Sequence, residues 1–172
     1  MKRLLLLMVA FVATVAANRP LSGAVQDVDC RGTGVPRVTA QQLSVSPPSY
    51  AFLVTNLASV PLTGVVIGRH DRHMQIMGSA PNIPAQMLAP AGWEGRHIHV
   101  EETAHLVYLW ENKDAAQRLE PQQSVAGFRI DLPRSTDPAQ ATFERMPFKA
   151  SLADGSCRWG FVGLDKMLNE RR

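Results

Sequence analysis

The sequence predicts an all-β protein, a single antiparallel β-sandwich of about 7–8 strands. Three observations favour this fold class. Short runs of aliphatic, aromatic and β-branched residues recur along the chain, and turn residues separate them. Twelve prolines are scattered over 172 residues, so few windows are long enough for an uninterrupted helix. Little hydrophobic periodicity of the helical kind is sustained after residue 17, and no internal repeat is visible.

The first seventeen residues predict a secretory signal peptide. A short basic start ends at Arg3, residues 4–15 are apolar and uncharged, and small residues at Val15-Ala16-Ala17 provide a cleavage site. The alternative is a retained membrane anchor, but the apolar run has about a dozen residues and a spanning helix needs about 20. We therefore expect a periplasmic or secreted protein that has no transmembrane anchor after cleavage.

The remaining chain has the length of one domain. We expect a polar lead-in at residues 18–36, the sandwich at residues 37–163 and a polar tail at residues 164–172. Loss of the signal peptide removes two basic residues and lowers the formal net charge from +3 to +1. The net charge is small and the sequence contains no dense run of basic residues, so it does not predict a nucleic-acid partner.

The first expected strands lie at residues 37–45, 50–55 and 62–69. The first of them alternates, with Val38, Leu43 and Val45 apolar, and the second reads Tyr-Ala-Phe-Leu-Val-Thr. Between them, Pro47-Pro48-Ser49 predicts a turn, and residues 56–59 predict the next one.

The later expected strands follow the same alternation of apolar runs and turns. A turn at Asn112-Lys113-Asp114 ends one pair of strands, and Asp154-Gly155 predicts another turn. We expect strands at residues 96–101, 105–110, 124–132 and 157–162, and one or two short strands within residues 143–152.

Several of these segments resemble immunoglobulin-like modules of uncharacterised bacterial exported proteins. They are Tyr-Ala-Phe-Leu-Val-Thr-Asn-Leu-Ala-Ser-Val-Pro-Leu-Thr-Gly-Val at residues 50–65, Ala-Pro-Ala-Gly-Trp at residues 89–93, Tyr-Leu-Trp at residues 108–110, and residues 119–128. The resemblance covers roughly residues 37–163. It implies an immunoglobulin- or fibronectin-III-like sandwich and brings no catalytic residues with it.

Cys30 and Cys157 are the two cysteines of the chain. In an oxidising compartment such a pair predicts one structural disulfide. The alternative is a redox-active or metal-binding pair, and the long separation without a C-x-x-C motif argues against it.

Histidine and methionine gather in the middle of the chain, and their imidazole and thioether groups suit copper. In a strand, His97 and His99 would face the same way, and a hairpin could bring His105 near His99. The alternative is that these side chains lie on the surface or fill gaps in the core. The later element, His97-Ile98-His99, also lacks the His-x-Met of small copper chaperones. The candidate metal ligands are His73, Met74, Met77, His97, His99 and His105.

Residues 75–92 carry no charge and are rich in methionine and proline. Such a segment could be a binding loop, or a crossover packed against the edge of the sandwich. Met87 and Trp93 are the candidate contact residues, and we expect Trp93 to be exposed. Trp110 is expected in the core, and Trp159 is expected to pack near the disulfide.

The sequence contains no G-x-S-x-G elbow, P-loop or G-x-G-x-x-G motif, and no nucleophile, base and orienter in a recognisable arrangement. We therefore expect a non-catalytic exported protein, without a cofactor, that binds a protein, an envelope component or a small ligand through its loops. The alternatives are a periplasmic copper-binding protein and, third, a secreted enzyme.

Overall fold

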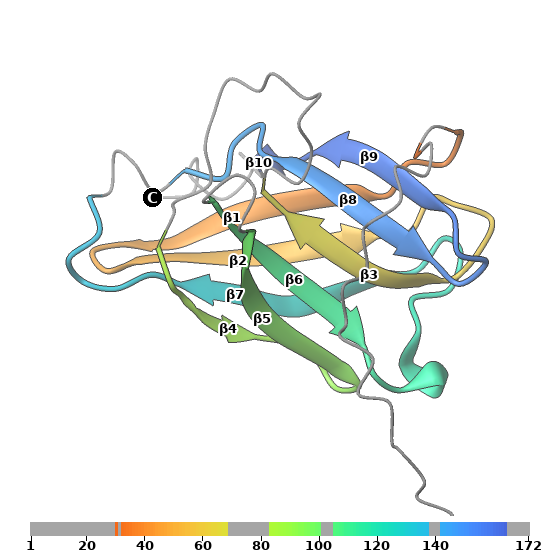
Figure 1. Ribbon diagram of the computed structural model, residues 1–172, viewed down its shortest axis with the longest axis horizontal. Coiled ribbons are helices and arrows are strands. Elements are labelled where there is room, and N and C mark those ends of the chain that lie inside the picture. Colours follow the sequence, from red (N-terminus) through yellow and green to blue (C-terminus); the bar gives the residue numbers. More distant parts are fainter. Residues whose placement is uncertain (1–29, 31, 69–82, 101–104, 138–141, 165–172) are drawn as a thin grey trace, which may run out of the picture.

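The computed structural model describes residues 30, 32–68, 83–100, 105–137 and 142–164. Two five-stranded sheets lie face to face and form a sandwich (Figure 1). The predicted all-β architecture is thereby confirmed. Within the described part of the chain, no helix has the length and apolar character that a membrane crossing requires.

Sheet A contains five strands in the spatial order β10-β1-β2-β7-β4. All neighbouring strands are antiparallel except β10, which runs parallel to β1. The strands are β10 (Gly163–Leu164), β1 (Arg37–Val45), β2 (Pro48–Thr55), β7 (Ser124–Asp131) and β4 (Gln86–Leu88).

Sheet B has the spatial order β5-β6-β3-β8-β9, and every neighbouring pair is antiparallel. Hairpins join β5 to β6 and β8 to β9, and β3 lies between the two hairpins (Figure 1). The strands are β5 (Trp93–Val100), β6 (His105–Asn112), β3 (Leu62–Ile67), β8 (Pro147–Leu152) and β9 (Cys157–Phe161).

The longer strands lie where the sequence predicts them, and the shortest elements were missed. Strands β4 and β10 have three and two residues, too few to show a period of two. The one-turn 3-10 helix η1 (Ala115–Gln117) was also missed; its preceding Asp114 carboxylate accepts a hydrogen bond from the Ala116 N–H. The turn expected at residues 47–49 is shifted, because β2 already begins at Pro48.

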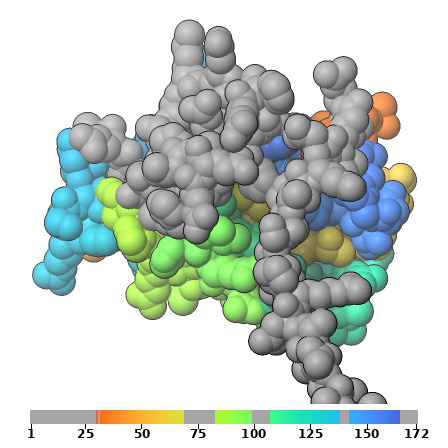
Figure 2. All heavy atoms as spheres, viewed as in Figure 1, coloured from red at the N-terminus to blue at the C-terminus, as the bar shows by residue number. Residues whose placement is uncertain are grey.

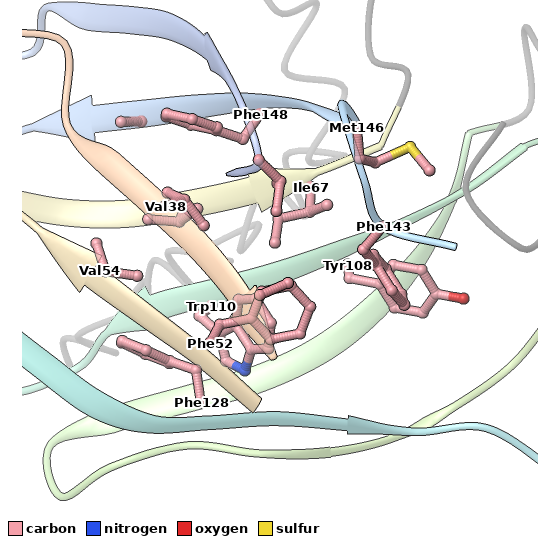
Figure 3. Close-up of a cluster of buried hydrophobic side chains, with 14 of the residues drawn as sticks. Val38, Phe52, Val54, Ile67, Tyr108, Trp110, Phe128, Phe143, Met146 and Phe148 are labelled. Atoms are coloured by element: carbon pink, nitrogen blue, oxygen red, sulfur yellow. The ribbon is translucent and has the colours of Figure 1, made fainter. Parts of the chain in front are cut away.

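Aromatic rings from both sheets fill the space between them (Figure 3). The indole of Trp110 lies between Phe52 and Phe128, with ring centroids 5.2 Å away in both cases. Phe143 contacts the rings of Tyr50, Phe52 and Tyr108. Because these rings are contributed by both sheets, burying them holds the two layers together.

Asn56 joins two loops at one end of the sandwich. Its side chain is fully buried, and its amide nitrogen donates to the carbonyls of Val60 and Leu119, at 2.9 Å each. Its side-chain oxygen accepts from the Ala58 N–H at 2.9 Å. All three interactions are satisfied inside the protein, so the buried polar group carries no desolvation deficit.

The structure contains the predicted disulfide between Cys30 and Cys157, whose Cα atoms are 4.6 Å apart. The bond attaches the lead-in to β9, the edge strand of sheet B. Beside it, the Trp159 N–H donates to the Cys30 carbonyl at 3.3 Å, and the Arg158 guanidinium donates to the Thr33 carbonyl at 3.1 Å.

Candidate interaction surface

The predicted metal ligands fall into two groups. His73, Met74 and Met77 lie outside the described residues. Strands β5 and β6 form the expected hairpin, but the register pairs His99 with Leu106 and pairs His105 with Val100, so His99 and His105 are not cross-strand partners. His97 is exposed and lies opposite Tyr108.

Among the residues that the structure describes, no three His, Cys, Asp or Glu side chains are placed to hold a metal ion. The copper hypothesis therefore gains no support from the described part of the chain. It stays a prediction about a region that includes residues outside that part.

Trp93 corrects one expectation, because the structure buries it to 8% exposure. Gly92 has a φ of 76° immediately before it, a conformation that favours glycine, and β5 begins at Trp93 itself. The ring meets Phe128 edge-to-face at 5.3 Å, and its indole N–H donates to the Gln117 carbonyl at 3.0 Å. The expectation of an exposed contact residue here was wrong, since Trp93 is a core residue.

Met87 is half-buried in β4, where it lies opposite Ile130 and packs against the core. Strand β4 forms the edge of sheet A beside β7. The described part of the uncharged segment 75–92 therefore packs against the sandwich. This agrees with the predicted alternative of a crossover packed against the sandwich edge. Residues 75–82 lie outside the described part.

The outer face of sheet B carries several apolar side chains in cross-strand rows. Leu109 and Val66 are cross-strand partners, and both alternate with core residues on their strands, so they point away from the core. The same row continues to Arg96 on β5 and, through Lys149 on β8, to Trp159 on β9. One row of side chains therefore crosses all five strands.

A second row on the same face contains two cross-strand pairs, and both are apolar. Ile98 lies opposite Val107, and Pro147 lies opposite Phe161. Val107 is buried, at 2% exposure, although it is outside the main core cluster, while Phe161 is 58% exposed. The accessible part of this face therefore lies towards β9. Figure 2 shows the molecule from this side, with blue atoms from the β8–β9 region at the surface on the right.

Charged side chains border the apolar rows at the β5–β6 hairpin. The Lys113 ammonium lies 2.5 Å from the Glu111 carboxylate and 3.9 Å from that of Glu94. The Arg96 guanidinium lies 3.7 Å from Glu111. All four side chains are about half exposed, so these ion pairs contribute little to stability.

The sequence does carry a signal for this outer face. Residues 106–110 read Leu-Val-Tyr-Leu-Trp, an apolar run without the alternation expected of a strand that has one side in water. Such a run is typical of a strand with apolar surroundings on both faces.

Comparison with known proteins agrees with this architecture. A solved structure of an uncharacterized protein from Nocardia farcinica, described as having an immunoglobulin-like fold, matches with a TM-score of 0.51 and 16% sequence identity; the match covers 72% of this chain and 82% of that one. The fold is immunoglobulin-like. The predicted resemblance to uncharacterised bacterial proteins of this fold is confirmed.

Two structures of a GH20 exo-β-N-acetylglucosaminidase from Vibrio harveyi, one with N-acetylglucosamine and one an inactive mutant, match with a TM-score of 0.38 and 13% identity. Each match covers 76% of this chain and 18% of the enzyme. No protein-family model matches the sequence, and no curated protein matches it either.

Proposed function

We propose that this protein is an exported, non-catalytic binding module that contacts a protein partner through the outer face of sheet B. The observation that carries the proposal is the pair of side-chain rows across this face, which end at Trp159 and Phe161 on β9. Phe161 is among the most exposed large hydrophobic side chains of the described residues. Clustered apolar side chains at a surface are typical of interaction sites.

The chemistry of the face favours a protein over a small ligand. Small-ligand sites are concave and enclose most of their ligand, whereas a sheet face offers a broad, open surface. Aromatic side chains also dominate the binding energy of protein interfaces, because they bury a large area with few rotatable bonds. Trp159 is half-buried and Phe161 exposed, so both rings are partly available to a partner.

Export is supported by two features that agree. The N-terminal segment has the composition of a signal peptide, and the Cys30–Cys157 bond is of the kind that persists in oxidising compartments. The non-catalytic role is supported by the face itself. Apart from Lys149, the described charges on this face lie at the β5–β6 hairpin, where they pair with one another.

A photo-crosslinking amino acid can test this face inside producing cells. We expect a crosslinker in place of Phe161 to give a discrete protein adduct. A crosslinker in place of Leu53, which is 41% exposed on the outer side of sheet A, should give none. Leu53 is the matched control, since it is also an apolar strand residue of similar accessibility.

The same adduct provides the second measurement. With the crosslinker at Phe161, substitution of the neighbouring Trp159 by serine should weaken the adduct several-fold, because the partner loses an aromatic contact. Equal adducts from both sheets, or none from sheet B, would contradict the proposed surface.

A further inference from the structure

The edges of the two sheets differ in how they are protected. At the β9 edge of sheet B, the lead-in is attached by the disulfide and by the Trp159–Cys30 hydrogen bond. At the edges of sheet A, β4 has three residues and β10 has two. Short strands and covered strands are the usual ways in which proteins prevent their edges from pairing with other chains.

Strand β5 forms the fourth edge, and it is neither short nor, among the described residues, tied to another segment by a disulfide. It is eight residues long and contains no proline. Among the described residues, the backbone hydrogen bond that reaches β5 from outside sheet B is that of the Trp93 N–H with the Pro90 carbonyl, 3.1 Å long and at the very start of the strand. No described residue forms a backbone hydrogen bond with the outward groups of the residues that follow, so these groups can pair with another strand.

We propose that β5 pairs with β5 of a second copy of this chain, antiparallel, about a two-fold axis at Gly95. The two copies of sheet B would then form one continuous sheet. This inference does not depend on the partner surface proposed above, because it uses the β5 edge of the sheet and not the aromatic residues of β9.

Charge complementarity selects the partner and the register. Glu94 and Arg96 point to the same side of β5, since they lie opposite Glu111 and Leu109 on the outer side of β6. In an antiparallel pair centred on Gly95, Glu94 of each copy lies opposite Arg96 of the other. Two opposite-charge pairs form at once, which is the self-complementary pattern that a two-fold axis requires.

Neighbouring registers that keep the same faces together are less favourable. Centring the pair on Glu94 places two carboxylates opposite each other, and centring it on Arg96 places two guanidinium groups opposite each other. Like charges in directly opposed positions destabilise a strand pair. A slip that puts the outer side of one strand beside the inner side of the other would mismatch every side chain.

Sedimentation velocity of protein expressed from the full chain, over a range of concentrations, tests this dimer. A single pair of strands buries less surface than a stable interface, so we expect weak association that becomes visible in concentrated protein. Glu94→Arg and Arg96→Glu should each weaken it about tenfold or more, because each places like charges opposite each other twice. The double variant, with the two charges exchanged, should associate like the wild type to within a few-fold.

Mixing the two single variants, once circular dichroism shows that both are folded, tests the charge pattern directly. One variant then carries arginine at both positions and the other carries glutamate at both, so the mixed pair is complementary at both contacts. We expect a heterodimer to form in the mixture, while each variant by itself remains monomeric. Lys149→Glu is the matched control, because it reverses a charge on the same face of sheet B, on β8 and away from β5, and should leave the association unchanged.

Three results would overturn the inference. One is a wild-type protein that stays monomeric at every concentration. Another is a dimer that the single variants leave unchanged. The third is a mixture of the two variants that does not associate.

Discussion

The outer faces of the two sheets are arranged differently, although both sheets pack on one core. On sheet A, the outward residues of β2 are Ser49, Ala51, Leu53 and Thr55, and they lie beside polar partners such as Arg129 and Asp131. On sheet B, the outward residues of β3 and β6 include Val66, Val107 and Leu109.

Hydrogen bonds join polar side chains on the outer side of sheet A, which also exposes Leu53 and Leu88. Ser49 donates to the carboxylate of Asp131, which also accepts from Arg129 at 2.7 Å. The hydroxyls of Thr55 and Ser124 lie 2.8 Å apart. An apolar surface gains free energy when a partner removes it from water. The row of apolar pairs on sheet B is the basis on which we propose that side as the contact surface.

Removing the disulfide should change the free energy of unfolding more than any other substitution discussed below. The bond attaches the lead-in to sheet B alone. We expect Cys30→Ser combined with Cys157→Ser to lower the free energy of unfolding by about 4 to 5 kcal/mol, because the unfolded chain regains the entropy of a very long loop. Urea denaturation measures this change. Wild-type protein treated with a reductant is the control and should lose a similar amount; an unchanged midpoint in both would contradict the role of the bond.

The two sides of β6 can be compared directly by truncating neighbouring residues. Trp110→Ala should cost about 3 to 5 kcal/mol of unfolding free energy, because the ring is fully buried between Phe52 and Phe128. Leu109→Ala, on the outer side, should cost about 1 kcal/mol, because the side chain is only half-buried. Thermal and urea denaturation of both variants check this order, and equal losses would mean that the outer face is as fully packed as the core.

Two buried tyrosines, one of them on the inner face of β6, predict that the free energy of unfolding depends on pH in the alkaline range. Burial raises the pKa of Tyr108, and that of Tyr50, above the usual value of 10.0. The unfolded chain therefore loses these phenolic protons first as the pH rises.

We expect the free energy of unfolding to be steady below about pH 10 and to fall above it, by up to about 1.4 kcal/mol per pH unit for each tyrosine. Tyr108→Phe should reduce the slope, although it also removes the hydrogen bond from the Tyr108 hydroxyl to the Ile83 carbonyl. Denaturation between neutral pH and pH 11 measures it, and a slope that Tyr108→Phe leaves unaltered would rule out this residue as the cause.

The surface ion pairs should give the smallest effects on either sheet. Lys113→Gln at the border of sheet B and Arg129→Gln on sheet A should each change the free energy of unfolding by less than about 1 kcal/mol, because the groups are substantially exposed. High salt should remove the difference from wild type. A larger loss that persists in salt would show that one of these pairs supports the packing of its sheet.

Particular residues show how far sequence reasoning reached. The bounds of β1 were predicted in full from an alternation with Val38, Leu43 and Val45 apolar and a turn after Val45, although Leu43 and Val45 are exposed in the structure. The disulfide was also predicted, since the chain has two cysteines and an N-terminal segment typical of export. Trp93 was misplaced, because a tryptophan after a Pro-Ala-Gly turn looks the same in sequence whether the turn directs its ring outward or into the core.

The sequence by itself determined the fold class, the position of most strands and the pairing of the cysteines. Alternation, turn residues and cysteine count are local or compositional signals, so they need no knowledge of neighbouring strands. Only the tertiary structure decided which side chains share a face, because that depends on strand order and register. Val66, Leu109 and Trp159 are far apart in sequence, and their common row exists because β6, β3, β8 and β9 lie side by side.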